Sequence, residues 1–131
     1  MREILFRGKP LGKIDEDFVY GSLGVISTDL VAIYQCEEYY EDIITLVDIG
    51  TVGQYTGLND KNGKKIFEGD IVKTDKFSEP NKQYIIKYDL QFGAFIGQDK
   101  YNAYFVTFDG DSDQFEIIGN IHDCKAEDFL K

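Results

Sequence analysis

The sequence predicts a mainly β protein of short antiparallel strands with one or two short helical turns. Three observations lead to this fold class. β-Branched and aromatic residues gather in short runs, and Gly, Asn, Asp and Ser separate the runs. The pair Asn62-Gly63 lies between two such runs and is a strong local signal for a β-hairpin. The 9 Tyr and 10 Phe residues supply apolar surface for a core and argue against a disordered chain.

The N-terminal part of the chain is predicted to form an antiparallel sheet. Its β-prone runs alternate apolar and polar residues or consist of β-branched and aromatic side chains. Gly21-Ser22 interrupts this pattern and predicts the turn of a hairpin. The expected strands cover residues 2–8, 18–20, 24–27 and 30–35, in a β-rich N-terminal subdomain of residues 1–50.

The segment of residues 37–47 allows two interpretations. Its apolar side chains recur at the spacing of one face of an amphipathic helix. Its continuous run Ile-Ile-Thr-Leu-Val favours a strand instead, and we predict a strand over residues 43–48. Asp48 is then the candidate N-cap of a helical turn through residues 50–55, which ends at Gly57.

The second half of the chain is predicted to form a small SH3-like barrel. Short β-prone runs follow one another there with tight turns between them, and their number and length suit a five-stranded barrel. The tail, residues 124–131, is expected to add one or two helical turns. Residues 51–131 form the second predicted subdomain, in one compact unit with the first. The expected barrel strands cover residues 65–74, 83–88, 91–97, 103–108 and 115–121.

Residues 48–73, DIGTVGQYTGLNDKNGKKIFEGDIVK, place two turn signals and the start of a strand in a short span. Asn62-Gly63 suits a type I′ turn, and Gly69-Asp70 predicts a corner before a buried Ile-Val pair. With MREILFR at the start of the chain and IIGNIH at residues 117–122, this motif resembles the YopX family of phage and prophage proteins. The resemblance implies a fold and a phage setting, and it implies no established biochemical activity.

Most polar residues of this motif suit structural roles in turns. Asp and Asn side chains commonly accept backbone N–H bonds that hold tight turns, and Gly supplies positive φ. Paired carboxylates suit acid–base chemistry as well, so that alternative stays open. The residues expected to shape the turns are Gly57, Asp60, Asn62, Gly63, Glu68, Gly69 and Asp70. Three neighbouring side chains, Gln54, Tyr55 and Thr56, either fix a loop or offer polar groups around an aromatic ring for recognition.

The chain carries a formal net charge of −10. This charge argues against binding to a phosphate backbone, because affinity for nucleic acid comes largely from Lys and Arg. Acidic residues are usually a solubilising surface, but here they cluster, which also suits recognition of a basic partner. One cluster is Glu37, Glu38, Glu41 and Asp42, and the other is Asp109, Asp111 and Asp113.

The sequence predicts no metal and no cofactor. His122 is the one histidine, and the DGDSD sequence at residues 109–113 lacks the glycine and glutamate that an EF-hand calcium loop needs. Two cysteines form no disulfide framework, and Cys36 follows an apolar run and is expected to be buried. No apolar run is long enough to span a membrane, so a cytoplasmic protein is the expectation.

These observations favour a non-catalytic protein-binding module, an adaptor or inhibitor with an acidic surface. The expected partner is a host or phage protein, or a second copy of the chain, since several tyrosines exceed the needs of a small core. One alternative is a nucleic-acid-associated SH3-like protein, which would need its lysines on one face. Another is an enzyme with an unrecognised polar site. The lysines concerned are Lys64, Lys65, Lys73, Lys76 and Lys82.

Overall fold

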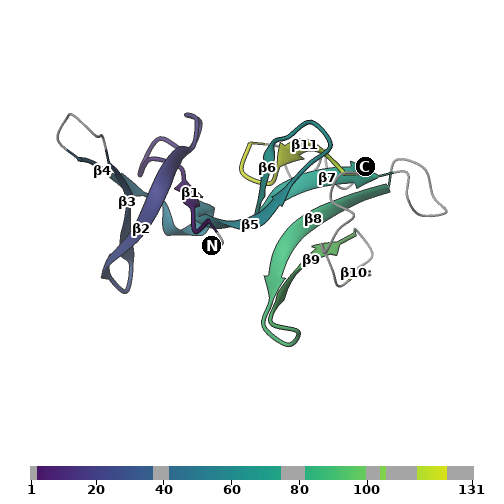
Figure 1. The fold of residues 1–131 in the computed structure, drawn as a ribbon. Helices are drawn as coiled ribbons and strands as arrows, with labels where there is room; N and C mark the ends of the chain where they lie inside the picture. The colour runs from purple at the N-terminus through teal and green to yellow at the C-terminus, as the bar shows by residue number, and fades with distance from the viewer. Residues whose placement is uncertain (1–2, 37–41, 75–81, 100–103, 106–114, 124–131) are drawn as a thin grey trace. The chain divides into compact units, whose positions relative to one another are not determined.

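The protein is mainly β and divides into two compact units, Met1–Tyr55 and Thr56–Lys131 (Figure 1). In the part of the chain that the structure describes, the helical content is a single 3-10 turn, so the predicted fold class is confirmed. No helix in that part has the length and apolar character needed to cross a membrane. The computed structural model describes residues 3–36, 42–74, 82–99, 104–105 and 115–123.

The N-terminal unit is an antiparallel sheet in the order β4-β3-β2-β1. The first residues of β5 pair with the other side of β1. Its core consists of the buried Val31, Ile33 and Val47, with partly buried apolar side chains from β1 and β2 packed against them. The strands are β1 (Phe6–Gly8), β2 (Val19–Ser27), β3 (Leu30–Gln35), β4 (Ile43–Val47) and β5 (Gly53–Asn59).

The hairpin predicted around Gly21-Ser22 is wrong, because β2 runs through both residues without a turn. The glycines serve close packing instead. A Cβ on Gly21 would lie 2.3 Å from the backbone oxygen of Tyr34, and a Cβ on Gly24 would lie 2.0 Å from the Tyr34 ring. Glycine therefore lets β2 pair closely with β3, a role that sequence alone does not distinguish from a turn.

The segment after residue 42 is a strand, as predicted, and not the alternative helix. Asp48 caps the 3-10 turn η1 (Ile49–Thr51), with its side chain accepting a hydrogen bond from Gly50 N at 2.9 Å. The helical turn predicted through residues 50–55 ends earlier. The residues after it pair with β1, and Tyr55 N donates to Leu5 O at 2.8 Å, which keeps the backbone extended.

The C-terminal unit contains a curled five-stranded antiparallel sheet in the order β10-β9-β8-β7-β11 (Figure 1). Four strands follow one another as a meander, and the last strand returns to pair with the first, which is the strand order of an SH3-like half-barrel. β6 lies beside β5. The predicted strand 65–74 is two strands here, separated by a turn at Glu68-Gly69. The strands are β6 (Lys65–Phe67), β7 (Asp70–Thr74), β8 (Lys82–Asp89), β9 (Ala94–Gln98), β10 (Tyr104–Phe105) and β11 (Glu116–Asn120).

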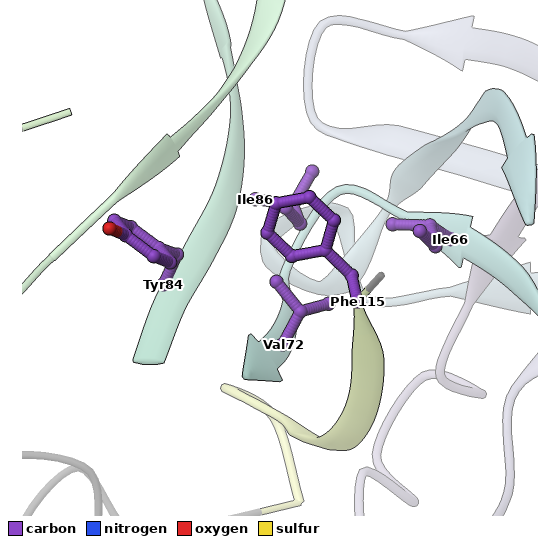
Figure 2. Packing of buried hydrophobic residues seen from close by; sticks show 5 residues of the cluster. All are labelled: Ile66, Val72, Tyr84, Ile86 and Phe115. Atoms are coloured by element: carbon purple, nitrogen blue, oxygen red, sulfur yellow. The ribbon is translucent and has the colours of Figure 1, made fainter. Parts of the chain in front are cut away.

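The core of this unit lies on the inner face of the curled sheet. Figure 2 shows Phe115 directed toward its apolar neighbours from β6, β7 and β8. The predicted helical turns of residues 124–131, and the DGDSD turn, lie outside the described residues. The five buried side chains of the core are Ile66, Val72, Tyr84, Ile86 and Phe115.

Candidate functional site

The hairpin of the motif is held by the buried carboxylate of Asp60. Its Oδ1 accepts hydrogen bonds from Asn62 N and Lys64 N, each at 2.9 Å. Gly63 N donates to Asp60 O at 3.0 Å, and Asp60 N donates to Lys64 O at 2.8 Å. This pattern is a three-residue loop with Gly63 at φ +81°, one residue longer than the expected type I′ turn. The carboxylate selects the longer loop because it binds two N–H groups within it.

The second oxygen of the same carboxylate connects the hairpin to β11. Asp60 Oδ2 accepts a hydrogen bond from Ile117 N at 3.0 Å, and Lys61 N donates to Phe115 O at 2.9 Å. These bonds join residues that are more than 50 positions apart. A single buried side chain therefore organises both a local turn and a long-range contact.

Glu116 adds an ionic contact at this place. Its carboxylate lies 3.4 Å from Lys61 Nζ and 3.4 Å from Lys73 Nζ. The hydrogen bond from Lys61, with the charges of both lysines, holds the pKa of Glu116 below its usual value. The side chain is partly exposed, so water and salt screen these ion pairs.

The Gly69-Asp70 corner forms the other end of the motif. Asp70 is buried, and its Oδ2 accepts a hydrogen bond from Phe67 N at 2.8 Å. Gly69 has φ +89°, donates to Ile86 O at 2.8 Å and accepts from Ile121 N at 2.9 Å. A Cβ on Gly69 would lie 3.3 Å from His122 Nε2. The corner thus needs glycine both for its backbone angle and for space.

The hairpin, the corner and β11 together form what we call the clasp. It joins two of the three sequence stretches that carry the family resemblance, through contacts of residues 60–73 with residues 115–121. Of the remaining turn residues, Gly57 is exposed with φ +89°, and Glu68 is partly buried. Within the clasp, the carboxylates of Asp60 and Asp70 both accept hydrogen bonds from backbone N–H groups.

Two of the three candidate recognition residues on β5 are buried. Tyr55 is 6% exposed and Thr56 is 8% exposed. Thr56 Oγ1 donates to Ile66 O at 2.8 Å and accepts from Leu58 N at 3.2 Å. Gln54 is partly buried and pairs with Phe6 across the strands. This placement leaves little of the Tyr55 ring for contact with a partner.

Strand β4 is an edge of the N-terminal sheet, and its outer side is half covered. Leu11 N donates to Leu46 O at 2.9 Å, and Asp48 N donates to Lys9 O at 2.8 Å. The chain turns away from β4 after Leu11. Residues 9–11 therefore bridge to one half of this edge, and no other strand of the described residues pairs with the other half.

Ile44 lies on the half that Lys9–Leu11 does not reach. Backbone groups of successive strand residues point to opposite edges, so Ile44 N–H and C=O point outward like those of Leu46. The side chain of Ile44 is 57% exposed, beside exposed Ile43 and Leu46. Asp42, which directly precedes the strand, is also exposed. The other members of its acidic cluster, Glu37, Glu38 and Glu41, lie outside the described residues.

A second apolar surface lies at the β8–β9 turn. Asp89 Oδ1 accepts hydrogen bonds from Gln91 N at 2.8 Å and Phe92 N at 3.0 Å, which shapes the turn. Leu90 at its tip is 89% exposed, and Tyr88 is 45% exposed. These two tyrosines therefore differ in exposure, because Tyr84 is buried in the core whereas Tyr88 faces solvent.

The described residues contain no cluster of three or more His, Cys, Asp or Glu side chains placed to hold a metal ion. His122 is partly buried at the end of β11, and His122 N donates to Asn120 Oδ1 at 2.9 Å. Cys36 is exposed, so the prediction of a buried thiol is wrong. It lies just past the end of β3, where the apolar pattern no longer faces the core.

A family model described as "YopX protein" matches residues 25–125. The chain belongs to the YopX family. The match covers both the β4 edge and the clasp, and it confirms the resemblance carried by the motif.

A solved structure, the crystal structure of protein EF1440 from Enterococcus faecalis, is similar to this YopX-family chain along the whole length of both. The TM-score is 0.61, the sequence identity is 21%, and the alignment covers 100% of each chain. At this identity the likeness shows a shared fold. A search of the curated proteins found no match.

The β4 edge was missed by reasoning from the sequence. The local signal was present, since a β-branched run follows the acidic cluster directly. Which strand ends a sheet, however, depends on strand order, and strand order is set by contacts between distant parts of the chain.

Proposed function

We propose that this YopX-family protein is a phage- or prophage-derived, non-catalytic protein-binding module that acts in the host cytoplasm. The proposal rests chiefly on the N-terminal unit, where exposed apolar side chains of β4 follow the exposed Asp42. Ile43 and Ile44 are about half exposed, and exposed Asp42 precedes them. Exposed apolar side chains beside a charged rim are typical of protein-binding surfaces.

The charge distribution supports a protein partner over nucleic acid. The net charge is −10, and two of the lysines that a nucleic-acid site would need lie beside carboxylates. Lys73 Nζ is 3.4 Å from Glu116, and Lys82 Nζ is 3.2 Å from the buried Asp99. Cations already neutralised by carboxylates release fewer counterions from a phosphate backbone.

Affinity capture from a host-cell lysate with the tagged full chain tests this proposal. The expected result is one stoichiometric partner whose retention falls with salt, because a charged contact is screened. Charge reversal of Glu37, Glu38, Glu41 and Asp42 should abolish capture. A matched control reverses four other exposed acids of the same unit, Asp15, Glu16, Asp17 and Asp29.

The outcomes separate the possible functions. Equal loss in both charge variants would indicate non-specific attraction and would contradict a defined site. If only the protein itself is recovered, and light scattering shows a defined oligomer, the result would indicate that the protein binds a second copy of itself and not a different protein. Retention on DNA with a steep salt dependence would favour the nucleic-acid alternative.

A further inference from the structure

We propose that the outer edge of β4 at Ile44 binds an extended basic segment of a partner protein by strand addition. This inference rests on the proposed function and specifies how the partner is held. In strand addition, main-chain hydrogen bonds supply affinity and alternate side chains supply specificity.

The protein itself shows that this edge accepts antiparallel backbone pairing, since Pro10 forms an isolated bridge with Val47. Lys9 and Leu11 bind its C-terminal half through Asp48 N to Lys9 O at 2.8 Å and Leu11 N to Leu46 O at 2.9 Å. The same pattern continued by one pair would use Ile44 N–H and C=O. A partner segment would therefore extend a ladder that the fold has already begun.

The side chains along this half of β4 suit an added strand. Ile44 is 57% exposed and stands on the face opposite the core residues of the sheet, since its cross-strand partner is Tyr34 and not Ile33. Alternate apolar residues of an added strand would pack beside Ile44 on that face. Edge strands that proteins protect from pairing are usually short, charged or blocked by Pro, and residues 43–45 contain neither a charge nor a Pro.

Charge identifies the chemistry of the segment. Exposed Asp42 directly precedes the strand, and Glu37, Glu38 and Glu41 precede it in the sequence. Lys or Arg on the incoming strand would meet the negative charge of Asp42, whereas acidic segments would be repelled.

The same residues argue against a second copy as the occupant. An antiparallel pair of β4 strands centred on Ile44 would place Asp42 of one copy opposite Leu46 of the other, where Leu11 already binds Leu46 O. Moving the centre to Asp42 avoids Leu11 but places the Asp42 residues of the two copies opposite each other. Like charges placed opposite each other destabilise a strand pair.

Titration of the full-length protein with defined peptides tests this inference. The probe is a short acetylated peptide with Val at the position that faces Ile44 and Lys two residues along, on the same face, at the position that faces Asp42. Two control peptides replace Lys by Glu or carry N-methyl groups on alternate residues, which removes the donors for strand pairing. We expect the Lys peptide to shift the amide resonances of Ile44 and its neighbours, with binding at least about tenfold weaker for either control.

Two substitutions at Ile44 separate the contribution of its backbone N–H to peptide binding from that of its side chain. Ile44→Pro removes an outward N–H while leaving the bonds to β3, a place where an edge strand tolerates Pro. Ile44→Thr keeps the N–H and the β-branched shape. We expect about tenfold weaker peptide binding for Ile44→Pro and a change within about threefold for Ile44→Thr.

Several results would overturn strand addition. One is equal binding of the N-methylated peptide to the wild-type protein, a test that does not depend on how Ile44→Pro folds. Another is the absence of any Ile44 shift at millimolar peptide concentrations. A dimer in light scattering that Ile44→Pro dissociates would assign the edge to a second copy. If the lysate partner is still captured in the first two cases, protein binding stands and only its mode is wrong.

Discussion

At the scale of single residues, Asp60 shows how one carboxylate connects sequence to fold. Its three acceptor contacts satisfy the N–H groups of Asn62, Lys64 and Ile117 in a buried place. Sequence reasoning placed Asp60 in a turn, since Asp before Asn-Gly favours one. The contact with Ile117 depends on β11 returning to this position, which no local pattern describes.

Replacing Asp60 with Ala should destabilise the protein by about 2–4 kcal/mol, because three backbone donors lose their acceptor in a buried site. Urea denaturation followed by circular dichroism measures the change. As a control, Asp29→Ala in the exposed β2–β3 turn should stay within about 0.5 kcal/mol. Equal effects of the two substitutions would show that the Asp60 carboxylate contributes little.

The two motif glycines allow backbone strain to be separated from packing. Gly63 and Gly69 both have positive φ, but a Cβ on Gly63 meets open space and one on Gly69 approaches His122. Gly63→Ala should cost about 1–2 kcal/mol for the backbone angle, and Gly69→Ala about 1 kcal/mol more. Urea midpoints test this order, and a Gly63→Ala variant less stable than Gly69→Ala would contradict it.

At the scale of elements, β2 is shaped by what packs against it. In the sequence its glycines resemble those of a turn. In the structure they lie where β3 is too close to leave room for a Cβ. Gly21 faces a backbone oxygen, which cannot rotate away, and Gly24 faces the Tyr34 ring, which can. Whether a glycine marks a turn or a close contact therefore depends on how the two strands pair.

We expect Gly21→Ala to destabilise the protein by about 2 kcal/mol or more, and Gly24→Ala by less, because the Tyr34 side chain can move. Thermal unfolding of both variants measures the difference. Adding Tyr34→Ala to Gly24→Ala should recover part of the loss if the ring causes it. No recovery would show that Gly24 is needed for another reason.

Strand β11 should make stability depend on pH through Glu116. Its pKa is lowered in the folded state, so its contribution is present above the unfolded-state pKa and is lost as pH falls through the folded-state pKa. At low salt, urea midpoints of wild type should exceed those of Glu116→Gln at neutral pH, and the gap should close in acid. A gap that persists unchanged in acid would exclude this ion-pair contribution.

At the scale of the whole molecule, charge and topology act separately. The net charge of −10 causes self-repulsion, whereas the two sheets arise from strand pairing. Each unit has its own buried cluster of apolar side chains, with no helix needed to cover it in the described residues. The clasp lies in the C-terminal unit, and the proposed binding edge lies in the N-terminal unit.

Salt should therefore stabilise the protein as a whole. Raising NaCl screens repulsion among the excess acids, and we expect the Tm to rise by about 2–4 °C between low and moderate ionic strength. Differential scanning calorimetry measures the shift. Glu116→Gln, which lacks the two salt-sensitive ion pairs, should show a larger rise than wild type. A Tm that falls with salt would mean that attractive ion pairs outweigh net repulsion.

The sequence by itself determined the fold class, a strand predicted at residues 43–48 and observed at residues 43–47, the Asp48 cap, the turns at Asn62-Gly63 and Gly69-Asp70, and membership of the YopX family. These features depend on neighbouring residues, because β-branched runs, Asn-Gly pairs and capping carboxylates act over a few positions. Tertiary structure alone decided that β2 is continuous, that Asp60 reaches β11 and that β4 ends its sheet. Each of these features depends on which distant strands pair. The free energy of that pairing comes from contacts between separate parts of the chain, so no single stretch of sequence predicts it.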